Sequence, residues 1–281
     1  MGKFSDVLLT VDFDRTLTAP DSTIPERNLE AIQYFMDNGG AFTVNTGRSI
    51  PMFSQLMDVV PVNAPLLLYN GSAAYDKETG AFPFVHEIDL DWRETIWRTM
   101  ELFPGHTVEL QGVKHHYLFK PDHMWRDFCI HNSCPWAYSS LEDELGPFLK
   151  FSVYGEFRDV TVSHLYSGTP EEFARMDEIQ KKLEEVFADK CVVFRAANRI
   201  LDVHAKGVSK ARSARELQKK LGRKMLVCVG DGENDIAMLK EADYAFCPGD
   251  AIVKELFPNV CGCADGAVAD VIYEKIPEIL G

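Results

Sequence analysis

The strongest constraint on the fold is an alternation of apolar and amphipathic segments that stops near residue 84 and resumes near residue 199. Val7–Val11, "AFTVN" (41–45) and "PLLLYN" (65–70) are short apolar runs typical of buried strands. "KMLVCVG" (224–230) and "DYAFC" (243–247) continue the pattern later in the chain. Buried strands that alternate with helices form a parallel sheet with helical crossovers. The sequence therefore predicts an α/β fold with one discontinuous, Rossmann-like parallel-sheet domain.

The segments between these runs are predicted to be helices. Residues 24–40 place Leu29, Ile32 and Met36 on one face, with Pro25 near the start and glycines at the end. Further helices are expected at residues 50–59, 209–221 and 267–279. The turn signals in "NGSAAYDKETGAFPF" (70–84) indicate a hairpin that leaves the sheet.

Residues 84–198 have a different, more aromatic texture. One helix is expected from the spacing of Trp92, Ile96 and Met100, and another from a capping box at Thr169 that opens a helix ending near Phe187. The runs "HHYLF", "LKFSVY", "VTVSHL" and "CVVFR" resemble strands. We therefore expect an inserted α+β domain at residues 84–198, between the two halves of a core domain at residues 1–83 and 199–281.

Composition narrows the class of function. The 281 residues carry a formal net charge of -14, which disfavours nucleic acid and anionic membranes as partners, because both require a basic face. The seven cysteines are an odd number and scattered, as expected for reduced thiols in a cytoplasmic protein. The N-terminal apolar stretch is too short for a signal peptide, and no run is long enough to span a membrane. The sequence leaves open whether the protein is a monomer or a homodimer.

Four polar motifs follow predicted strands or open the helices after them, where open α/β sheets bind ligands. Carboxylates crowded at one sheet edge require a cation, and oxygen ligands of this kind suit Mg²⁺. A hydroxyl, a lysine and backbone N–H groups at helix starts can hold a phosphate. A carboxylate facing such a phosphate can act as nucleophile, and a second carboxyl nearby can transfer the proton. The motif residues are Asp12 and Asp14; Thr46, Gly47 and Arg48; Lys210; and Asp231, Asn234 and Asp235.

Together, "DFDRTLT", "TGR", the lysine of "GVSK" and "GDGENDIAML" resemble the four motifs of the haloacid dehalogenase-like phosphohydrolases. The "NG" after the third strand and the large insert resemble the Cof-like branch, whose members carry a type-C2 cap and are mostly sugar-phosphate phosphatases. The resemblance implies an Mg²⁺-dependent phosphomonoesterase that acts on a small phosphorylated metabolite, such as a sugar phosphate, through an aspartyl-phosphate.

The resemblance also assigns roles to residues. It implies that Asp12 is the nucleophile and that Asp14 is the general acid and base. The implied phosphate-binding residues are Thr46, Gly47, Lys210 and Asn234, and the implied metal ligands are Asp12, the Asp14 carbonyl, Asp231 and Asp235. Arg15 departs from the pattern, because the family has glycine there, and either it fits the turn that glycine permits or it changes that turn. Arg15 and Arg48 are candidate contacts to the substrate or the cap.

Two other functions fit the same motifs. A phosphotransferase or phosphomutase would share the site and return the phosphoryl group to a substrate hydroxyl. A catalytically silent protein that binds a phosphorylated ligand would retain the residues without turnover. A receiver-type signalling module is disfavoured, since it places its phosphoacceptor after the third strand and lacks a large insert.

Overall fold

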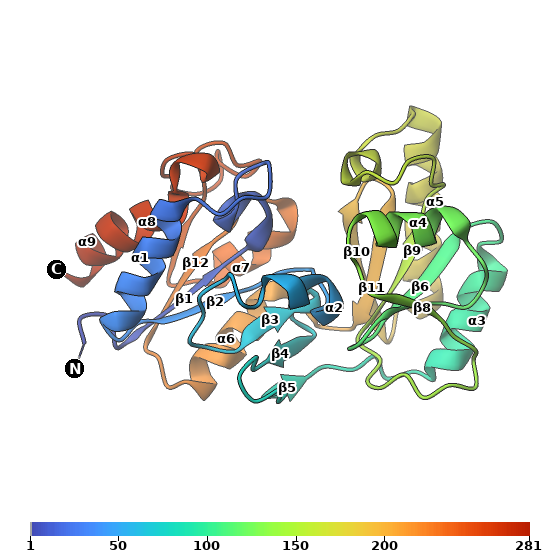
Figure 1. Ribbon diagram of the computed structural model, residues 1–281, viewed down its shortest axis with the longest axis horizontal. Coiled ribbons are helices and arrows are strands. Elements are labelled where there is room, and N and C mark those ends of the chain that lie inside the picture. Colours follow the sequence, from blue (N-terminus) through green and yellow to red (C-terminus); the bar gives the residue numbers. More distant parts are fainter. Residues whose placement is uncertain (1) are drawn as a thin grey trace. The chain divides into compact units, whose positions relative to one another are not determined.

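The computed structural model describes residues 2–281, which divide into two structural units (Figure 1). The first unit contains the residues up to Gly47 together with Leu56–Phe84 and Ser209–Gly281. The second contains Arg48–Gln55 and Val85–Val208. The return to the first unit therefore comes at Ser209, later than the residue 199 expected from the sequence, because residues 200–205 form a strand of the second unit's sheet.

The first unit is built on a parallel sheet of four strands in the order β13-β12-β1-β2. The N-terminal strand is central, paired with β12 on one side and β2 on the other, and its five residues are all buried. A bridge from Asn45 to Leu67 adds β3, which forms a small sheet with β4 and β5. The strands are β1 (Val7–Val11), β2 (Ala41–Val44), β3 (Leu66–Leu68), β4 (Ala73–Tyr75), β5 (Phe84–Val85), β12 (Met225–Val229) and β13 (Tyr244–Phe246).

Helices lie on both faces of this sheet (Figure 1). On one face α6 and α7 bury Ala214, Leu217 and Met238 against Leu8 and Cys228 of the strands. On the other face α1 packs along α8 and β2. The helices are α1 (Glu26–Asp37), α6 (Lys210–Lys220), α7 (Ile236–Glu241), α8 (Ala267–Asp270) and α9 (Ile276–Leu280).

One helix predicted from the sequence is present, and another is shorter than predicted. The C-terminal helix is present, since α8, a wider helical turn at Val271–Lys275 and α9 follow one another without a break. The helix predicted at residues 50–59 is wrong in length: α2 (Ile50–Phe53), in the second unit, gives way to a single turn at Ser54–Leu56. The Ser54 hydroxyl donates to the Pro51 carbonyl at 2.8 Å there, a side-chain bond that competes with the backbone bonds of a continued helix.

The second unit has a six-stranded sheet in the order β10-β11-β9-β6-β7-β8, antiparallel except for the pair β7 and β8. One face is apolar and is covered by α3 and α5, where Ile96, Phe151 and Leu183 belong to the same cluster. Around α4 a separate aromatic cluster forms, centred on Trp125. The strands are β6 (Thr107–Gln111), β7 (His116–Leu118), β8 (Trp136–Tyr138), β9 (Lys150–Tyr154), β10 (Cys191–Ala197) and β11 (Ile200–Ala205), and the helices are α3 (Trp92–Leu102), α4 (His123–His131) and α5 (Pro170–Phe187).

The predicted strand "VTVSHL" is wrong, since Val162–Tyr166 is a short helical turn. Its β-branched residues favour a strand, but local bonds hold the chain in a turn. The Thr161 N–H donates to the Asp159 carboxylate at 3.0 Å, and the Arg158 N–H donates to His164 Nε2 at 3.1 Å.

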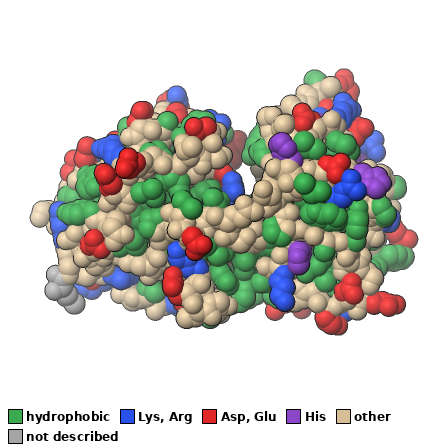
Figure 2. Space-filling view, in the orientation of Figure 1, with side chains coloured by type: hydrophobic (Ala, Val, Ile, Leu, Met, Phe, Trp, Pro, Cys, Tyr) green, Lys and Arg blue, Asp and Glu red, His purple; other side chains and the backbone are tan. Residues whose placement is uncertain are grey.

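The surface carries the charge expected from composition. On the face shown in Figure 2, Asp and Glu side chains are spread widely and Lys and Arg side chains lie in separate small groups. Among the residues described, no helix is both long enough and apolar enough to cross a membrane.

Candidate active site

The carboxyl ends of β1, β2 and β12 meet at one edge of the first unit's sheet. Strand pairing continues to the last residue of β1, since the Asp12 N–H donates to the Val229 carbonyl at 2.9 Å and the Asn45 N–H donates to the Val11 carbonyl at 2.8 Å. The residues that follow these strands therefore begin at the same level. Sequence motifs far apart in the chain converge here for this reason.

Lys210 is the centre of a buried charge cluster. Its Nζ lies 2.5 Å from Asp12 Oδ1 and 2.7 Å from Asp235 Oδ1, and all three side chains are less than a tenth exposed. Lys210 is the first residue of α6, whose start is capped by the Ser209 hydroxyl. The Asn45 side chain donates to the Lys210 carbonyl at 2.9 Å, which ties the start of α6 to the end of β2.

Asp231 and Asp235 complete the cluster from the loop after β12. Asp235 Oδ2 accepts the N–H groups of Asp231 at 3.1 Å and Gly232 at 3.0 Å, so the loop folds around this carboxylate. The Thr16 hydroxyl donates to Asp231 Oδ1 at 3.2 Å. One oxygen each from Asp12, Asp231 and Asp235 lie within 4.8 Å of one another. Within residues 2–281, no other group of three or more His, Cys, Asp or Glu side chains brings its ligand atoms this close together.

The electrostatics of the cluster favour an added cation. Burial raises the pKa of Asp12 well above its ordinary value; Lys210 acts against this, while Asp235, Asp14 and Asp231 add to it. Burial and Asp235 raise the pKa of Asp231 to about 6. Burial alone would lower the pKa of Lys210, but Asp12 and Asp235 outweigh it and raise that pKa, so the lysine is charged. One ammonium cannot balance three buried carboxylates, and an all-oxygen donor set of this kind fits Mg²⁺.

Arg15 takes the conformation that the family pattern assigns to glycine. Its φ is 61° and its ψ is 11°, in the left-handed region, and its side chain is exposed. Its N–H donates to the Thr18 hydroxyl at 3.2 Å, which supports the tight turn at Phe13–Leu17. Arg15 therefore fits a turn of the kind that glycine permits, and its charge acts against the rise in the pKa of Asp231.

The remaining predicted phosphate-binding residues lie on neighbouring loops of the first unit. Thr46 is buried, donates its N–H to the Leu67 carbonyl at 2.9 Å and accepts the Asn70 N–H at 3.0 Å. A Cβ on Gly47 would lie 2.8 Å from Asn70 Oδ1, so the backbone passes close to that amide. Asn234 is exposed on the helical turn Glu233–Asp235.

Two residues predicted to belong to the site, Asp14 and Arg48, are not members of the group formed by Lys210 and the three carboxylates. Asp14 is half-buried in the turn after β1, and its negative charge contributes to the raised pKa of Asp12. Arg48 belongs to the segment Arg48–Gln55, which the structure groups with the second unit.

Sequence reasoning missed several residues that build the site. Thr16 lies inside "DFDRTLT" and Asn45 directly precedes "TGR", so a polar side chain in or beside a recognised motif was the available signal. Residue 230 is glycine for a steric reason, because a Cβ there would lie 2.6 Å from the Cβ of Asp235. In the "NG" motif, Gly71 has a φ of 94° and passes so near α6 that a Cβ would lie 2.5 Å from the Ser209 carbonyl oxygen.

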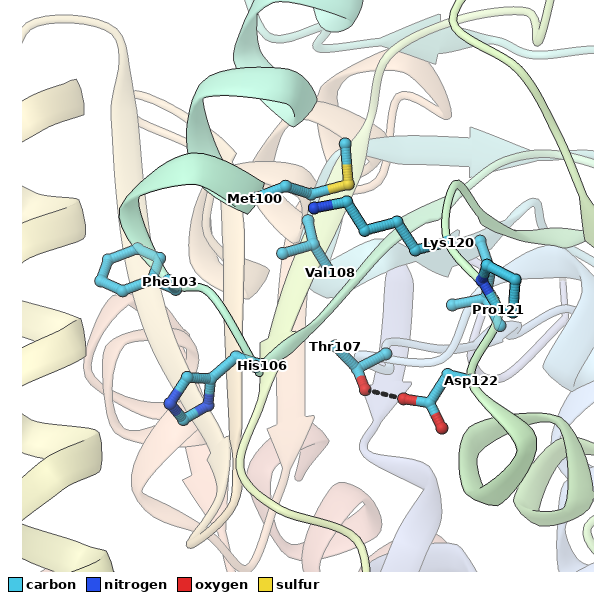
Figure 3. Close-up of a pocket in the computed structure, with 10 residues that line it drawn as sticks. Met100, Phe103, His106, Thr107, Val108, Lys120, Pro121 and Asp122 are labelled. Atoms are coloured by element: carbon cyan, nitrogen blue, oxygen red, sulfur yellow. Dashed lines mark hydrogen bonds between the residues drawn. The ribbon is translucent and has the colours of Figure 1, made fainter.

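A separate cavity of about 200 Å³ lies in the second unit and contains none of the carboxylate cluster. Figure 3 shows the Lys120 side chain extending toward Met100, and the Thr107 hydroxyl donating to Asp122. His106 lines the same cavity and its Nδ1 lies 2.9 Å from the Tyr154 carbonyl. Within residues 2–281 the metal-compatible side chains that lie close together are those of the first unit, so we assign the candidate active site to the carboxylate cluster and not to this cavity.

Comparisons with known proteins identify the family of the chain. The model of the family described as haloacid dehalogenase-like hydrolase matches residues 9–272. A 5-amino-6-(5-phospho-D-ribitylamino)uracil phosphatase of Bacillus subtilis is 26% identical over 253 residues, which cover 88% of this chain and 86% of the relative. The HMP-PP phosphatase of Serratia proteamaculans is 24% identical, with 93% of this chain and 92% of the relative covered.

Solved structures share the fold of this chain. The crystal structure of a haloacid dehalogenase-like hydrolase from Bacteroides thetaiotaomicron superposes with a TM-score of 0.79 at 20% identity, covering 98% of this chain and 100% of that one. The predicted α/β fold and the predicted phosphatase class are confirmed. The chain belongs to the haloacid dehalogenase-like hydrolases.

Proposed function

We propose that this phosphatase is an Mg²⁺-dependent phosphomonoesterase that hydrolyses a small phosphorylated metabolite through an aspartyl-phosphate on Asp12. The observation that carries the proposal is the position of Asp12. Its carboxylate is buried at the carboxyl end of the central strand, 2.5 Å from the Lys210 ammonium and within the cluster of Asp231 and Asp235. Such a carboxylate faces the place where a bound phosphate would meet both a lysine and a cation.

The proposed reaction has two displacements at phosphorus. An Asp12 oxygen attacks the phosphorus while the bond to the ester oxygen breaks, and Asp14 gives its proton to the departing alkoxide. Asp14 then takes a proton from water, whose oxygen attacks the phosphorus and breaks the bond to Asp12. Inorganic phosphate leaves, and both carboxyl groups return to their starting state.

Lys210 has two tasks in this scheme. Its ammonium holds a phosphate oxygen and offsets the charge that accumulates as the nucleophile approaches. Its bonds to Asp12 and Asp235 also keep the nucleophile in one orientation between turnovers. Thr46, Gly47 and Asn234 would complete the phosphate site with hydroxyl, backbone and amide donors.

The side chains of Asp12, Asp231 and Asp235 and the Asp14 carbonyl would hold Mg²⁺. When bound, the ion neutralises the carboxylates and withdraws charge from the phosphoryl oxygens, which supports ionised Asp12. The Thr16 hydroxyl and the loop N–H groups of Asp231 and Gly232 orient two of these ligands without occupying all their oxygens.

The substrate proposed is a sugar or polyol phosphate. This assignment is supported by the name of the Bacillus subtilis relative, whose substrate carries its phosphate on a ribityl chain. We assign substrate selection to the second unit, as expected for an inserted cap, with Arg15 and Arg48 as candidate contacts. A phosphotransferase would use the same residues, so the products have to be identified.

The test is a screen for phosphate release across sugar phosphates, polyol phosphates, the ribitylaminouracil phosphate and flavin mononucleotide. Each compound is assayed with Mg²⁺, with EDTA, and with the variants Asp12→Asn and Asp58→Asn. Asp58 is an exposed acid outside the cluster and serves as the matched control. We expect turnover that requires Mg²⁺, is lost in Asp12→Asn and is unchanged in Asp58→Asn. Phosphoryl transfer to a second substrate without free phosphate would favour the phosphotransferase, and full activity of Asp12→Asn would contradict the proposal.

A further inference from the structure

Two cysteines meet at the end of α4 in the second unit. The Cys134 N–H donates to the Cys129 carbonyl at 2.8 Å, because Ser133 has a φ of 54° and turns the chain back on the helix. The two thiol groups are close enough for each to shift the pKa of the other, and Cys134 Sγ lies 3.9 Å from the Pro135 carbonyl oxygen. Cys129 is fully buried and Cys134 is 7% exposed, so the pair reaches the surface only through Cys134.

A buried histidine and carboxylate stand behind this pair. His116, on β7, lies near the Cys134 thiol and lowers its pKa. Its Nδ1 lies 3.3 Å from Glu109 Oε1, and its Nε2 lies 2.7 Å from the Ser49 hydroxyl. Glu109 and Ser49 thus hold the imidazole ring in place.

Glu109 is itself fixed by neighbours. Its Oε1 accepts the Tyr154 hydroxyl at 2.8 Å and the Gln111 side-chain amide at 2.5 Å, and its side chain is fully buried. An ionised carboxylate in this position stabilises an imidazolium at His116. The imidazolium in turn stabilises a thiolate at Cys134.

The acidities of the cysteines follow this arrangement. The hydrogen bond from Cys129 lowers the pKa of Cys134 most; burial acts against it and His116 adds to it, with a result of about 6. Burial also acts against a charged His116, but Glu109 and Cys134 raise its pKa to about 10. The other six cysteines, including Cys129 and Cys191, all have raised pKa values, chiefly through burial. Cys134 is therefore the one cysteine of the seven whose surroundings favour the thiolate.

The cluster does not fit two other functions. A metal site is disfavoured, because within residues 2–281 the carboxylates of the first unit form the only group of ligand atoms that are mutually close. Nucleophilic attack on a large substrate is disfavoured too, since Cys134 is nearly buried beside Trp125 and Phe128. A low-pKa thiolate with a second thiol in contact instead has the features of a redox-sensitive pair, for which the attacking reagent has to be small.

We propose that Cys134 and Cys129 form a reversible, hydroperoxide-sensitive dithiol site in the second unit, with Cys134 as the reactive thiolate and Cys129 as the resolving thiol. The Cys134 sulfur attacks one oxygen of hydrogen peroxide; the O–O bond breaks, and the hydroxide released takes up a proton to become water. The Cys129 sulfur then attacks the Cys134 sulfenic acid; an S–S bond forms, the S–O bond breaks, and the hydroxide leaves with the Cys129 proton as a second water. A dithiol reductant reverses the change by thiol–disulfide exchange.

The chain offers a direct readout. Trypsin releases Asp127–Lys150, which contains Cys129 and Cys134 and no other cysteine, and it releases Cys191–Arg195 as an internal control. Reduced full-length protein at pH 7 is treated with one equivalent of hydrogen peroxide, the remaining thiols are alkylated, and both peptides are weighed over time. We expect Asp127–Lys150 to lose both alkylation sites and the mass of two hydrogens about tenfold faster than Cys191 is oxidised, and to recover on treatment with dithiothreitol.

Variants separate the roles of the two cysteines. In Cys129→Ser, Cys134 should stop at the sulfenic acid, which dimedone captures; in Cys134→Ser, Cys129 should remain a thiol. His116→Gln should slow the oxidation of Cys134. Equal oxidation rates for the two wild-type peptides, or irreversible oxidation of Cys134 without loss of Cys129, would overturn the proposal. The wild-type peptide map decides the matter even if a variant does not fold, and it is independent of phosphatase activity.

Discussion

Replacing Lys210 by Met tests whether one buried ammonium stabilises the carboxylate cluster. The substitution keeps the length of the side chain and removes its charge and its three N–H donors. Asp12 Oδ1 and Asp235 Oδ1, now 2.5 and 2.7 Å from Nζ, would lose that partner while remaining less than a tenth exposed. Removing one member of a buried ion pair costs about 3–5 kcal/mol, because the remaining charge is left uncompensated.

The expected loss is large enough to measure by thermal unfolding in EDTA, where no bound cation compensates for the missing ammonium. For a unit of this size a loss of about 3–5 kcal/mol corresponds to a fall in Tm of roughly 6–20 °C. Calorimetry is preferred, because the two units can unfold separately and a single transition cannot be assumed. Lys206→Met is the matched control, since Lys206 is exposed and its Nζ donates to the Ala188 carbonyl at 3.1 Å.

We expect Lys206→Met to change the free energy of unfolding by no more than about 0.5 kcal/mol. A Lys210→Met protein as stable as the control would contradict this expected loss. It would mean that the carboxylates are neutral or otherwise paired in the cation-free protein, and that Lys210 has no stabilising role between them.

Three further predictions concern the backbone and the second unit. Arg15→Gly should be more stable than Arg15→Ala by about 1 kcal/mol in urea unfolding, because only glycine relieves the φ of 61°; equal stabilities would count against strain at this turn. Gly230→Ala should lower kcat by about tenfold or more in the phosphatase assay, because a Cβ would lie 2.6 Å from that of Asp235; unchanged kcat would show that the loop adapts. Burial, with the charge of Lys150, lowers the pKa of His204 to about 3, so the unfolded chain binds a proton below pH 6.5 that the folded chain does not. Stability should therefore fall as the pH falls, by about 1.6 kcal/mol between pH 6.5 and 5 from this group, and His204→Gln should remove that part of the slope measured by urea unfolding; an unchanged slope would contradict the assignment.

Local features of the fold could be predicted from the sequence because their causes are local. The apolar run Val7–Val11 is a buried strand, and Thr169 and Glu172 form the expected capping box at the start of α5. The strand predicted at "VTVSHL" is wrong because side chains outside the segment, such as that of Asp159, hold the chain in a turn. The β-propensity of the segment does not describe such contacts. Propensity is a weak guide wherever polar side chains offer the backbone another partner.

The convergence of the motifs could also be predicted, because parallel strands end at a common edge. That rule brings Asp12 near Asp231 without any knowledge of the distances. It does not predict that Thr16 is the partner of Asp231. Nor does it predict that residue 230 has to be glycine, because that requirement comes from the close packing of the loop against the helical turn.

The cluster behind Cys134 lay beyond sequence reasoning. Its members come from two strands, a helix end and the segment that contains Ser49, and they carry no motif. Only the antiparallel pairing of β6 with β7, which sets Gln111 opposite His116, brings Glu109 within reach of the imidazole.

In the proposed reaction, Asp12 carries the phosphoryl group during turnover. The most direct measurement is an acid quench of the protein during reaction with labelled p-nitrophenyl phosphate, followed by mapping of the tryptic peptide Phe4–Arg15. The leaving group of this ester needs no proton, so Asp14→Asn should form the intermediate and hydrolyse it slowly. This role of Asp12 predicts a hydroxylamine-sensitive label on Phe4–Arg15 that accumulates in Asp14→Asn and is absent in Asp12→Asn. Turnover without label in this peptide, or label that persists in Asp12→Asn, would contradict it.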